Sequence, residues 1–282
     1  MKLARFIAEG GERIGAVRED GIVALDTGID RADDMTALIE RWPHEHARWR
    51  EQAREGNAVP LARVCLLAPV ARPSKIMAIG LNYADHIAES GMEKPGEQLW
   101  FAKMANTVNG PHDPVQVPRA SSKLDYEVEL VAVIGQGGRH IEADHAPSRV
   151  FGYCVGNDVS VRDWQMRTSQ WVLGKSFDGH APLGPWIVTA DELGDPHRLY
   201  IRCLVNGELR QSSSTRHLVF SVWEQLAHLS KAMTLRAGDL LFTGTPGGVG
   251  AAMQPPAWLR AGDVVRCEIE GIGAIENTVI DE

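Results

Sequence analysis

The stretch SKLDYEVELVAVIG, residues 121–134, places three carboxylates at the start of an expected buried strand. Asp125, Glu127 and Glu129 alternate with apolar residues, and the four residues before Gly135 are all apolar. Side chains alternate between the two faces of a strand, so we expect the three carboxylates to share one face, about 7 Å apart. The positions that continue this face are valines, so it enters a core. Buried carboxylates must be neutralised, paired or bound to a metal. The stretch therefore predicts a divalent-cation site, with a solvated acidic strand face as the alternative.

Strands and turns also fill most of the remaining chain. Residues 198–214 form the clearest predicted hairpin, because Asn206-Gly207 favours a tight two-residue turn. Residues 220–235 are expected to form an amphipathic helix whose apolar side chains recur on one stripe. Strands do not alternate regularly with helices, which disfavours a doubly wound parallel sheet. We therefore predict a mixed, β-rich fold built as a sandwich or roll.

The first seventy residues are typical of a small α+β unit. They contain short strands separated by glycine turns, and then a helix that Pro43 is expected to interrupt. Residues 67–75 carry two prolines and no periodic pattern, which is typical of a linker. The predicted organisation is a small N-terminal domain over residues 1–70 and a catalytic domain over residues 71–282.

Composition and charge limit the class of protein. The 282 residues are 44% hydrophobic and 23% charged, which is ordinary for a globular protein with a sizeable core. The net charge is −8 and the basic residues are scattered, so neither nucleic acid nor an anionic membrane is an expected partner. The four cysteines are far apart, and no apolar run reaches membrane length. Charged residues interrupt the apolar residues of MKLARFIAEGG, so we expect no signal peptide. These features predict a cytoplasmic protein with reduced thiols.

Two further stretches carry side chains suited to chemistry. Asp158 follows an apolar strand in GNDVSVRD, where it is either an ordinary turn aspartate or a third carboxylate beside the acidic strand. His86 and Glu89 are three residues apart in LNYADHIAES, so they share one face of a short helix. A carboxylate in that position can orient the imidazole as a general base. The alternative is an ordinary exposed polar face.

The residue types also indicate which metal a carboxylate site would take. Neither a paired-cysteine pattern nor an H-E-x-x-H pattern for zinc occurs in the sequence. Carboxylate oxygens are hard ligands that suit Mg²⁺, Mn²⁺ or Ca²⁺.

Two more stretches could contribute to such a site. Lys175 in VLGKSFDG could add a positive charge, unless it faces solvent. The glycine-rich segment LLFTGTPGGVG, residues 240–250, could hold an anion on its backbone N–H groups, unless it is only a flexible turn.

Taken together and in order, these stretches resemble the fumarylacetoacetate hydrolase superfamily. The matching motifs are GLNYADHIAE, DYEVELVAVIG, GYCVGNDVSVRDWQ, LGKSFD, LVNGELRQ and LLFTGTPGGVG. The resemblance implies the family's β-sandwich roll, usually assembled as a homodimer. It also implies a metal site formed by Glu127, Glu129 and Asp158, with Mg²⁺ or Mn²⁺ as the cofactor.

The resemblance implies roles for the other candidate residues as well. His86 and Glu89 would be the general base and its orienting partner. Lys175 would act in catalysis, and Gln165 and Thr245 would contact substrate oxygens.

The implied activity is metal-dependent hydrolysis of a C–C bond in a 2,4-dioxo acid, which releases pyruvate or a related keto acid. A lid-like segment over about residues 85–96 would order over this small-molecule substrate. Ser169 stands where the enzyme that names the family has a substrate-binding tyrosine, so fumarylacetoacetate itself is not the expected substrate. Two alternatives use the same metal-enolate chemistry: decarboxylation of an oxaloacetate-type acid and tautomerisation of an unsaturated keto acid. A catalytically silent binding protein is a further alternative, and the presence of both His86 and Glu89 argues against it.

Overall fold

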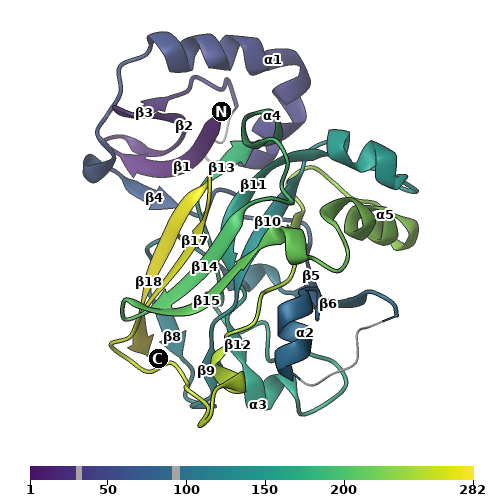
Figure 1. Cartoon of the computed structure of the whole chain (residues 1–282). Coiled ribbons are helices and arrows are strands. Elements are labelled where there is room, and N and C mark those ends of the chain that lie inside the picture. The colour runs from purple at the N-terminus through teal and green to yellow at the C-terminus, as the bar shows by residue number, and fades with distance from the viewer. Residues whose placement is uncertain (30–33, 91–95) are drawn as a thin grey trace.

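The larger of two packed sheets extends through the whole molecule in a computed structural model, which describes residues 1–29, 34–90 and 96–282 (Figure 1). Its strands follow in the order β3 (Gly21–Ala24), β2 (Gly11–Arg18), β1 (Lys2–Ala8), β13 (Ala181–Thr189), β11 (Val150–Asn157), β10 (Val128–Ile134), β16 (Leu240–Phe242), β5 (Ile76–Gly80) and β6 (Leu99–Lys103). Two short strands join it at the side, β4 (Cys65–Leu67) on β1 and β7 (Val108–Asn109) on β13.

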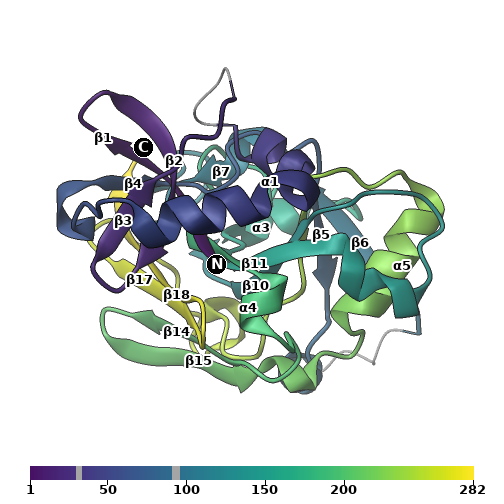
Figure 2. The same cartoon turned by 90° about the horizontal axis from the view of Figure 1, so that it is seen from above.

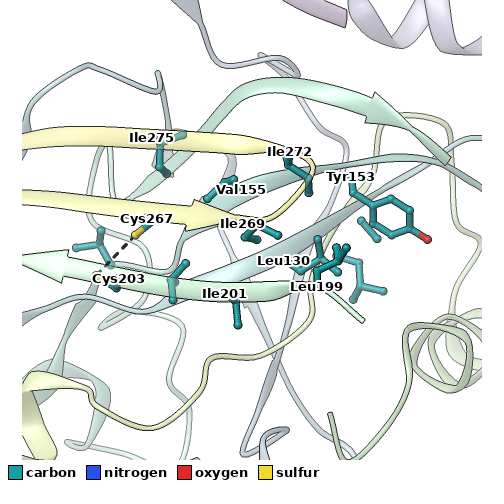
Figure 3. Close-up of a cluster of buried hydrophobic side chains, with 14 of the residues drawn as sticks. Leu130, Tyr153, Val155, Leu199, Ile201, Cys203, Cys267, Ile269, Ile272 and Ile275 are labelled. Atoms are coloured by element: carbon teal, nitrogen blue, oxygen red, sulfur yellow. Dashed lines mark hydrogen bonds between the residues drawn. The ribbon is translucent and has the colours of Figure 1, made fainter. Parts of the chain in front are cut away.

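The smaller sheet packs against the middle of the larger one. Its order is β15 (Glu208–Ser214), β14 (Tyr200–Val205), β17 (Val264–Ile269), β18 (Gly273–Asp281) and β8 (Val115–Val117). Between the sheets, Leu130 and Val155 of the larger sheet pack in one buried cluster with Ile201, Ile269 and Ile275 of the smaller one (Figure 3). The predicted mixed, β-rich sandwich is therefore confirmed, and the hairpin turn at Asn206-Gly207 joins β14 to β15 as predicted.

The N-terminal strands continue the larger sheet. Strand β1 pairs antiparallel with β13, with Leu3 opposite Ile187. Helix α1 (Met35–Glu55) lies over β2 and β3 at this end of the sheet (Figure 2). A β-sheet ladder therefore joins the first seventy residues to the rest of the chain.

Helix α1 continues through Pro43, so the predicted interruption there was wrong. A proline inside a helix removes one hydrogen bond and costs about 3 kcal/mol. Leu38 and Ile39 are buried before Pro43, and Trp49 and Ala53 are buried after it. Burial of side chains on both sides of the proline offsets its local cost, because each fully buried large apolar side chain contributes about 1.5–3 kcal/mol.

The remaining elements are short apart from one helix. They are α2 (Ala84–Ser90), α3 (Arg162–Gln165), α4 (Ala190–Leu193), α5 (Val222–Ala232), the paired strands β9 (Leu124–Asp125) and β12 (Ser160–Val161), and the 3₁₀ turns η1 (Leu61–Arg63), η2 (Ala105–Thr107), η3 (Ala143–Arg149), η4 (Thr215–His217) and η5 (Gly250–Ala252). Helix α5 confirms the amphipathic helix predicted from the apolar stripe. In the part of the chain that the structure describes, no helix is both long enough and apolar enough to span a membrane. Residues 91–95 of the expected lid lie outside the described residues.

Candidate active site

Three carboxylates meet where β10 begins and β11 ends. Glu127 precedes β10, Glu129 lies within it, and Asp158 follows the last residue of β11. The strands pair with Glu129 opposite Gly156, and the Asp158 N–H donates to the Glu127 carbonyl oxygen over 2.9 Å. All three side chains are buried, and each offers an oxygen within 4.8 Å of the others. The fold therefore brings together the three residues that we predicted as metal ligands, hereafter the carboxylate cluster.

Asp125 does not belong to this cluster, although Arg162 contacts both Asp125 and Glu127. The expected strand over residues 124–134 is broken into β9 and β10, and β9 pairs with β12. Asp125 instead accepts hydrogen bonds from the N–H groups of Gly250 and Ala251, at 2.8 and 3.0 Å, and from Arg162 Nε at 2.8 Å. The expected strand is therefore not continuous, and Asp125 is held by backbone N–H groups and Arg162 outside the three-carboxylate cluster.

Within the described ranges, three cationic side chains contact the cluster, and the sequence had indicated only one of them. Lys175 Nζ lies 2.9 Å from Glu127 Oε2 and 2.7 Å from Asp158 Oδ2. Lys103 Nζ lies 2.7 Å from Asp158 Oδ1, and Arg162 Nη1 lies 2.6 Å from Glu127 Oε1. The only sequence signal for Arg162 was its place four residues after Asp158. The sequence signal for Lys103 was weaker still, because a lysine at the end of an apolar strand usually faces solvent.

These cations make the two glutamates electrostatically different. Burial raises the pKa of Glu127, but Lys175 and Arg162 outweigh burial and lower this pKa to about 2. For Glu129, burial together with the Asp158 and Glu127 carboxylates raises the pKa well above its usual range. Glu129 is therefore the member of the cluster whose charge is least compensated by the protein.

A divalent cation fits this site. Among the residues that the structure describes, and with Asp125 included, four buried carboxylates face three cations, which leaves excess negative charge. A cation between Glu127, Glu129 and Asp158 would remove the repulsion that disfavours the charged form of Glu129. The donors are all carboxylate oxygens, which suit Mg²⁺ or Mn²⁺. Charge and donor type together therefore support a divalent metal.

His86 and Glu89 lie on one face of α2, as predicted. His86 Nδ1 is 3.5 Å from Glu89 Oε2. Both Glu89 oxygens also accept the Gly248 N–H, at 3.0 and 2.9 Å. The distance from imidazole to carboxylate exceeds an ordinary hydrogen bond, and catalytic pairs without substrate often show such a separation. The arrangement suits a general base whose carboxylate partner is held in place by the backbone.

A cavity of about 540 Å³ is lined by this pair and by Glu127 of the carboxylate cluster. Glu129 and Asp158 lie behind Glu127 and are not part of the cavity lining. Arg162 contributes to its polar lining, and its Nη1 donates to Gln165 Oε1 over 3.0 Å. Phe101, Met166 and Trp171 contribute an apolar side. The lining also contains most of the predicted site residues: His86, Glu89, Glu127, Gln165, Lys175 and Thr245.

The glycine-rich segment after β16 binds one carboxylate of the carboxylate cluster and the carboxylate of the His86–Glu89 pair. The Gly244 N–H donates to Glu129 Oε2 over 2.7 Å, and the Gly248 N–H donates to Glu89. Gly248 has φ +102°, and a Cβ there would lie 2.0 Å from the Arg210 carbonyl oxygen. The predicted anion-holding N–H groups are therefore present, and they bind carboxylates of the protein itself.

We expect Gly248→Ala to destabilise the protein more than Gly262→Ala. Both glycines have positive φ, so a Cβ at either position costs about 1–2 kcal/mol of backbone strain. At Gly262 nothing lies within 4 Å of that Cβ, whereas at Gly248 it meets backbone. Urea unfolding should show an additional loss of about 1–3 kcal/mol in the free energy of unfolding for Gly248→Ala. Equal losses for the two variants would contradict a tight contact between this segment and β15.

Comparison of the sequence with family models then identifies the family. Residues 75–280 match the model described as Fumarylacetoacetate (FAA) hydrolase C-terminal, and residues 1–69 match the model described as Rv2993c-like, N-terminal. The chain belongs to the fumarylacetoacetate hydrolase family. The first match includes every predicted site residue, from His86 to Thr245.

Relatives within the fumarylacetoacetate hydrolase family include proteins named as tautomerases and as hydrolases. Oxaloacetate tautomerase fahd2, mitochondrial, of Xenopus laevis is 48% identical over 234 residues, which cover 82% of this chain and 73% of the relative. Oxaloacetate tautomerase FAHD2B, mitochondrial, of Bos taurus is 47% identical over 288 residues, which cover 99% and 92%. The crystal structure of maleylpyruvate hydrolase from Sphingobium sp. SYK-6, in complex with manganese(II) and pyruvate, matches with a TM-score of 0.86 at 34% identity, covering 100% of this chain and 99% of that one.

Proposed function

We propose that this chain is a divalent-metal-dependent tautomerase that interconverts the keto and enol forms of oxaloacetate or a closely related 2-oxo acid. The observation that supports this proposal is a single cavity lined by the His86–Glu89 pair and by Glu127, one member of the carboxylate cluster. Tautomerisation needs one group that moves a proton at C3 and a charged site that stabilises the oxygen at C2. Two of the relatives described above are named for this reaction.

His86 is the residue that would move the proton. It is the one histidine among the described residues that line the cavity. Its imidazole would take the proton from C3 of the keto form and return it in the reverse direction, while Glu89 fixes the orientation of the ring. The imidazolium would then give this proton to the C2 oxygen, so the reaction has no net change in protons and consumes no water.

Lys175 and Arg162 would provide positive charge around the substrate. Burial lowers the pKa of Lys175, but the Asp158 and Glu127 carboxylates outweigh burial and raise it, so the ammonium stays charged and cannot act as a base. Arg162 lines the cavity, where its guanidinium would add positive charge for a substrate carboxylate.

The carboxylate cluster of Glu127, Glu129 and Asp158 would hold the cation. When bound there, a divalent cation supplies Lewis acidity that stabilises negative charge on the 2-oxo acid end of the substrate. Gln165, held by Arg162, lies on the cavity wall and would orient the same end of the substrate.

Removal of the metal should abolish the activity. The proposal predicts that the purified chain accelerates the decay of the oxaloacetate enol absorbance. EDTA should eliminate this acceleration, and added Mg²⁺ or Mn²⁺ should restore it. Acceleration that persists unchanged after exhaustive chelation would contradict a role for the carboxylate cluster as a metal site.

Hydrolysis of a C–C bond is the second candidate, and the size and apolar side of the cavity favour it. The cavity volume of about 540 Å³ exceeds the needs of a four-carbon acid, and Phe101, Met166 and Trp171 could contact a longer substrate. The matched Sphingobium structure is that of a hydrolase. Pyruvate release from a panel of 2,4-dioxo acids, with no acceleration of enol decay, would replace the tautomerase proposal by this one. Absence of both reactions with Mg²⁺ and Mn²⁺ would refute both candidates.

A further inference from the structure

We infer that Gln211, which does not belong to the cavity lining, is a positioning residue that sets the place of Glu89 relative to the carboxylate cluster. Gln211 lies on β15 in the smaller sheet, and its side chain is fully buried. A buried carboxamide costs free energy unless its donors and acceptor are satisfied, so its partners show what it holds together.

The Gln211 carboxamide connects the acidic strand to the glycine-rich segment. Its Oε1 accepts the N–H of Val128, the residue between the two glutamates of the cluster, over 3.0 Å. Its Nε2 donates to Thr245 Oγ1 and to the Pro246 carbonyl oxygen, both over 2.8 Å. Thr245 Oγ1 in turn donates to the Val128 carbonyl oxygen over 2.9 Å. The carboxamide therefore uses both of its N–H groups and its oxygen to fix one segment against the other.

The segment that Gln211 holds contains Gly248, which binds Glu89, the partner of His86. Pro246 is two residues before Gly248, whose N–H binds both Glu89 oxygens. The other end of the segment binds the cluster, through Gly244 and Glu129. The backbone of residues 244–248 therefore sets the distance between the His86–Glu89 pair and the carboxylate cluster. Gln211 holds the middle of this segment.

The contact between this segment and β15 is close, which favours a direct mechanical link. At Gly248 an added Cβ would lie 2.0 Å from the Arg210 carbonyl oxygen and 3.2 Å from Gln211 Cα. Loss of the Gln211 hydrogen bonds should let this segment move away from β15 and carry Glu89 with it. A misplacement of about 1 Å near a reacting centre can lower turnover by about 10²-fold.

The first test is hydrogen exchange, which needs no activity. Gln211→Met keeps the length of the side chain and removes all three hydrogen bonds. Amide exchange in residues 243–250 and in α2 should become about tenfold faster, because unpaired buried groups favour local opening. The matched control is Asn277→Leu on β18. The Asn277 carboxamide is also buried, and it donates to the carbonyl oxygens of Gly110 and Asp113. Exchange in both regions should stay at the wild-type rate in this control.

The second test is a double-mutant cycle, and this kinetic part rests on the proposed function. Gln211→Met should lower kcat by about 10–100-fold with little change in KM, because substrate binding is retained while the base is misplaced. In a Glu89→Ala background the same substitution should lower kcat by less than about threefold, because two changes that act through one residue are not additive. Calorimetric Mn²⁺ titration should give the same affinity for Gln211→Met as for Asn277→Leu.

The outcomes separate this inference from the proposed function. Unchanged exchange in residues 243–250 and α2 would overturn the role of Gln211 whether or not the chain is an enzyme. An equal loss of kcat in both backgrounds, or a loss of Mn²⁺ affinity in Gln211→Met, would overturn positioning through Glu89. If the wild-type chain shows neither reaction, the proposed function fails, while faster exchange confined to Gln211→Met would still support the link to Glu89.

Discussion

Glu127→Gln should abolish divalent-metal binding and turnover together. The substitution preserves the shape of the side chain and removes one of three charged ligands, so metal affinity should fall by at least about 100-fold. Glu127 also contacts Lys175 and Arg162. Both cations keep a second carboxylate, at 2.7 Å from Asp158 and 2.8 Å from Asp125 respectively. The fold should therefore survive the loss of the Glu127 charge, although breaking buried ion pairs destabilises it.

A matched control separates loss of the metal from loss of ion pairs. Glu268 on β17 also contacts two cations, Arg202 and Arg266, and it lies in the smaller sheet away from the cavity lining. Glu268→Gln should keep wild-type Mn²⁺ affinity in a calorimetric titration and wild-type turnover. If Glu127→Gln binds Mn²⁺ as tightly as this control does, Glu127 is not a metal ligand.

The fold was predictable where local pattern and tertiary structure agree. The Asn206-Gly207 turn and the apolar stripe of α5 depend on neighbours in sequence, and both predictions are confirmed. Pro43 was misjudged because burial on both sides of it, which is tertiary, outweighs a local cost. The strand over residues 124–134 was expected to be continuous, but β9 pairs with β12, more than thirty residues later, and the chain breaks before β10 begins.

The site shows the same division between local and distant determinants. Glu127 and Glu129 are close in sequence, so their proximity followed from strand geometry alone. The cations that surround them come from elsewhere: Lys103 is 55 residues before Asp158, and Lys175 is 48 residues after Glu127. A single lysine in an apolar context does not reveal which carboxylate it will meet. Lys175 was predicted because it lies in LGKSFD, one of the ordered motifs of the family. Lys103 lies in none of those motifs, so it was not predicted.

His86→Ala should lower turnover by about 10²–10⁴-fold, which is the usual contribution of a positioned general base. Mn²⁺ affinity should remain at the wild-type value, because His86 lies on α2 and is not among the residues of the carboxylate cluster. His228→Ala on α5 is a suitable control, since His228 is a partly buried helical histidine outside the cavity lining. Steady-state kinetics at saturating Mg²⁺ and calorimetric metal titration on both variants provide the measurements.

Assays of His86→Ala with oxaloacetate and with 2,4-dioxo acids distinguish a tautomerase from a hydrolase. A tautomerase needs the base to exchange a proton with C3 of oxaloacetate, whereas a hydrolase needs it to deprotonate water before a C–C bond breaks. If the variant loses acceleration of enol decay, His86 acts on substrate carbon, and a matching loss of pyruvate release from 2,4-dioxo acids would extend its role to water. Full turnover of both substrates by His86→Ala would exclude it as the base. The Glu127→Gln variant separates these cases from loss of the metal, because it should fail with either substrate.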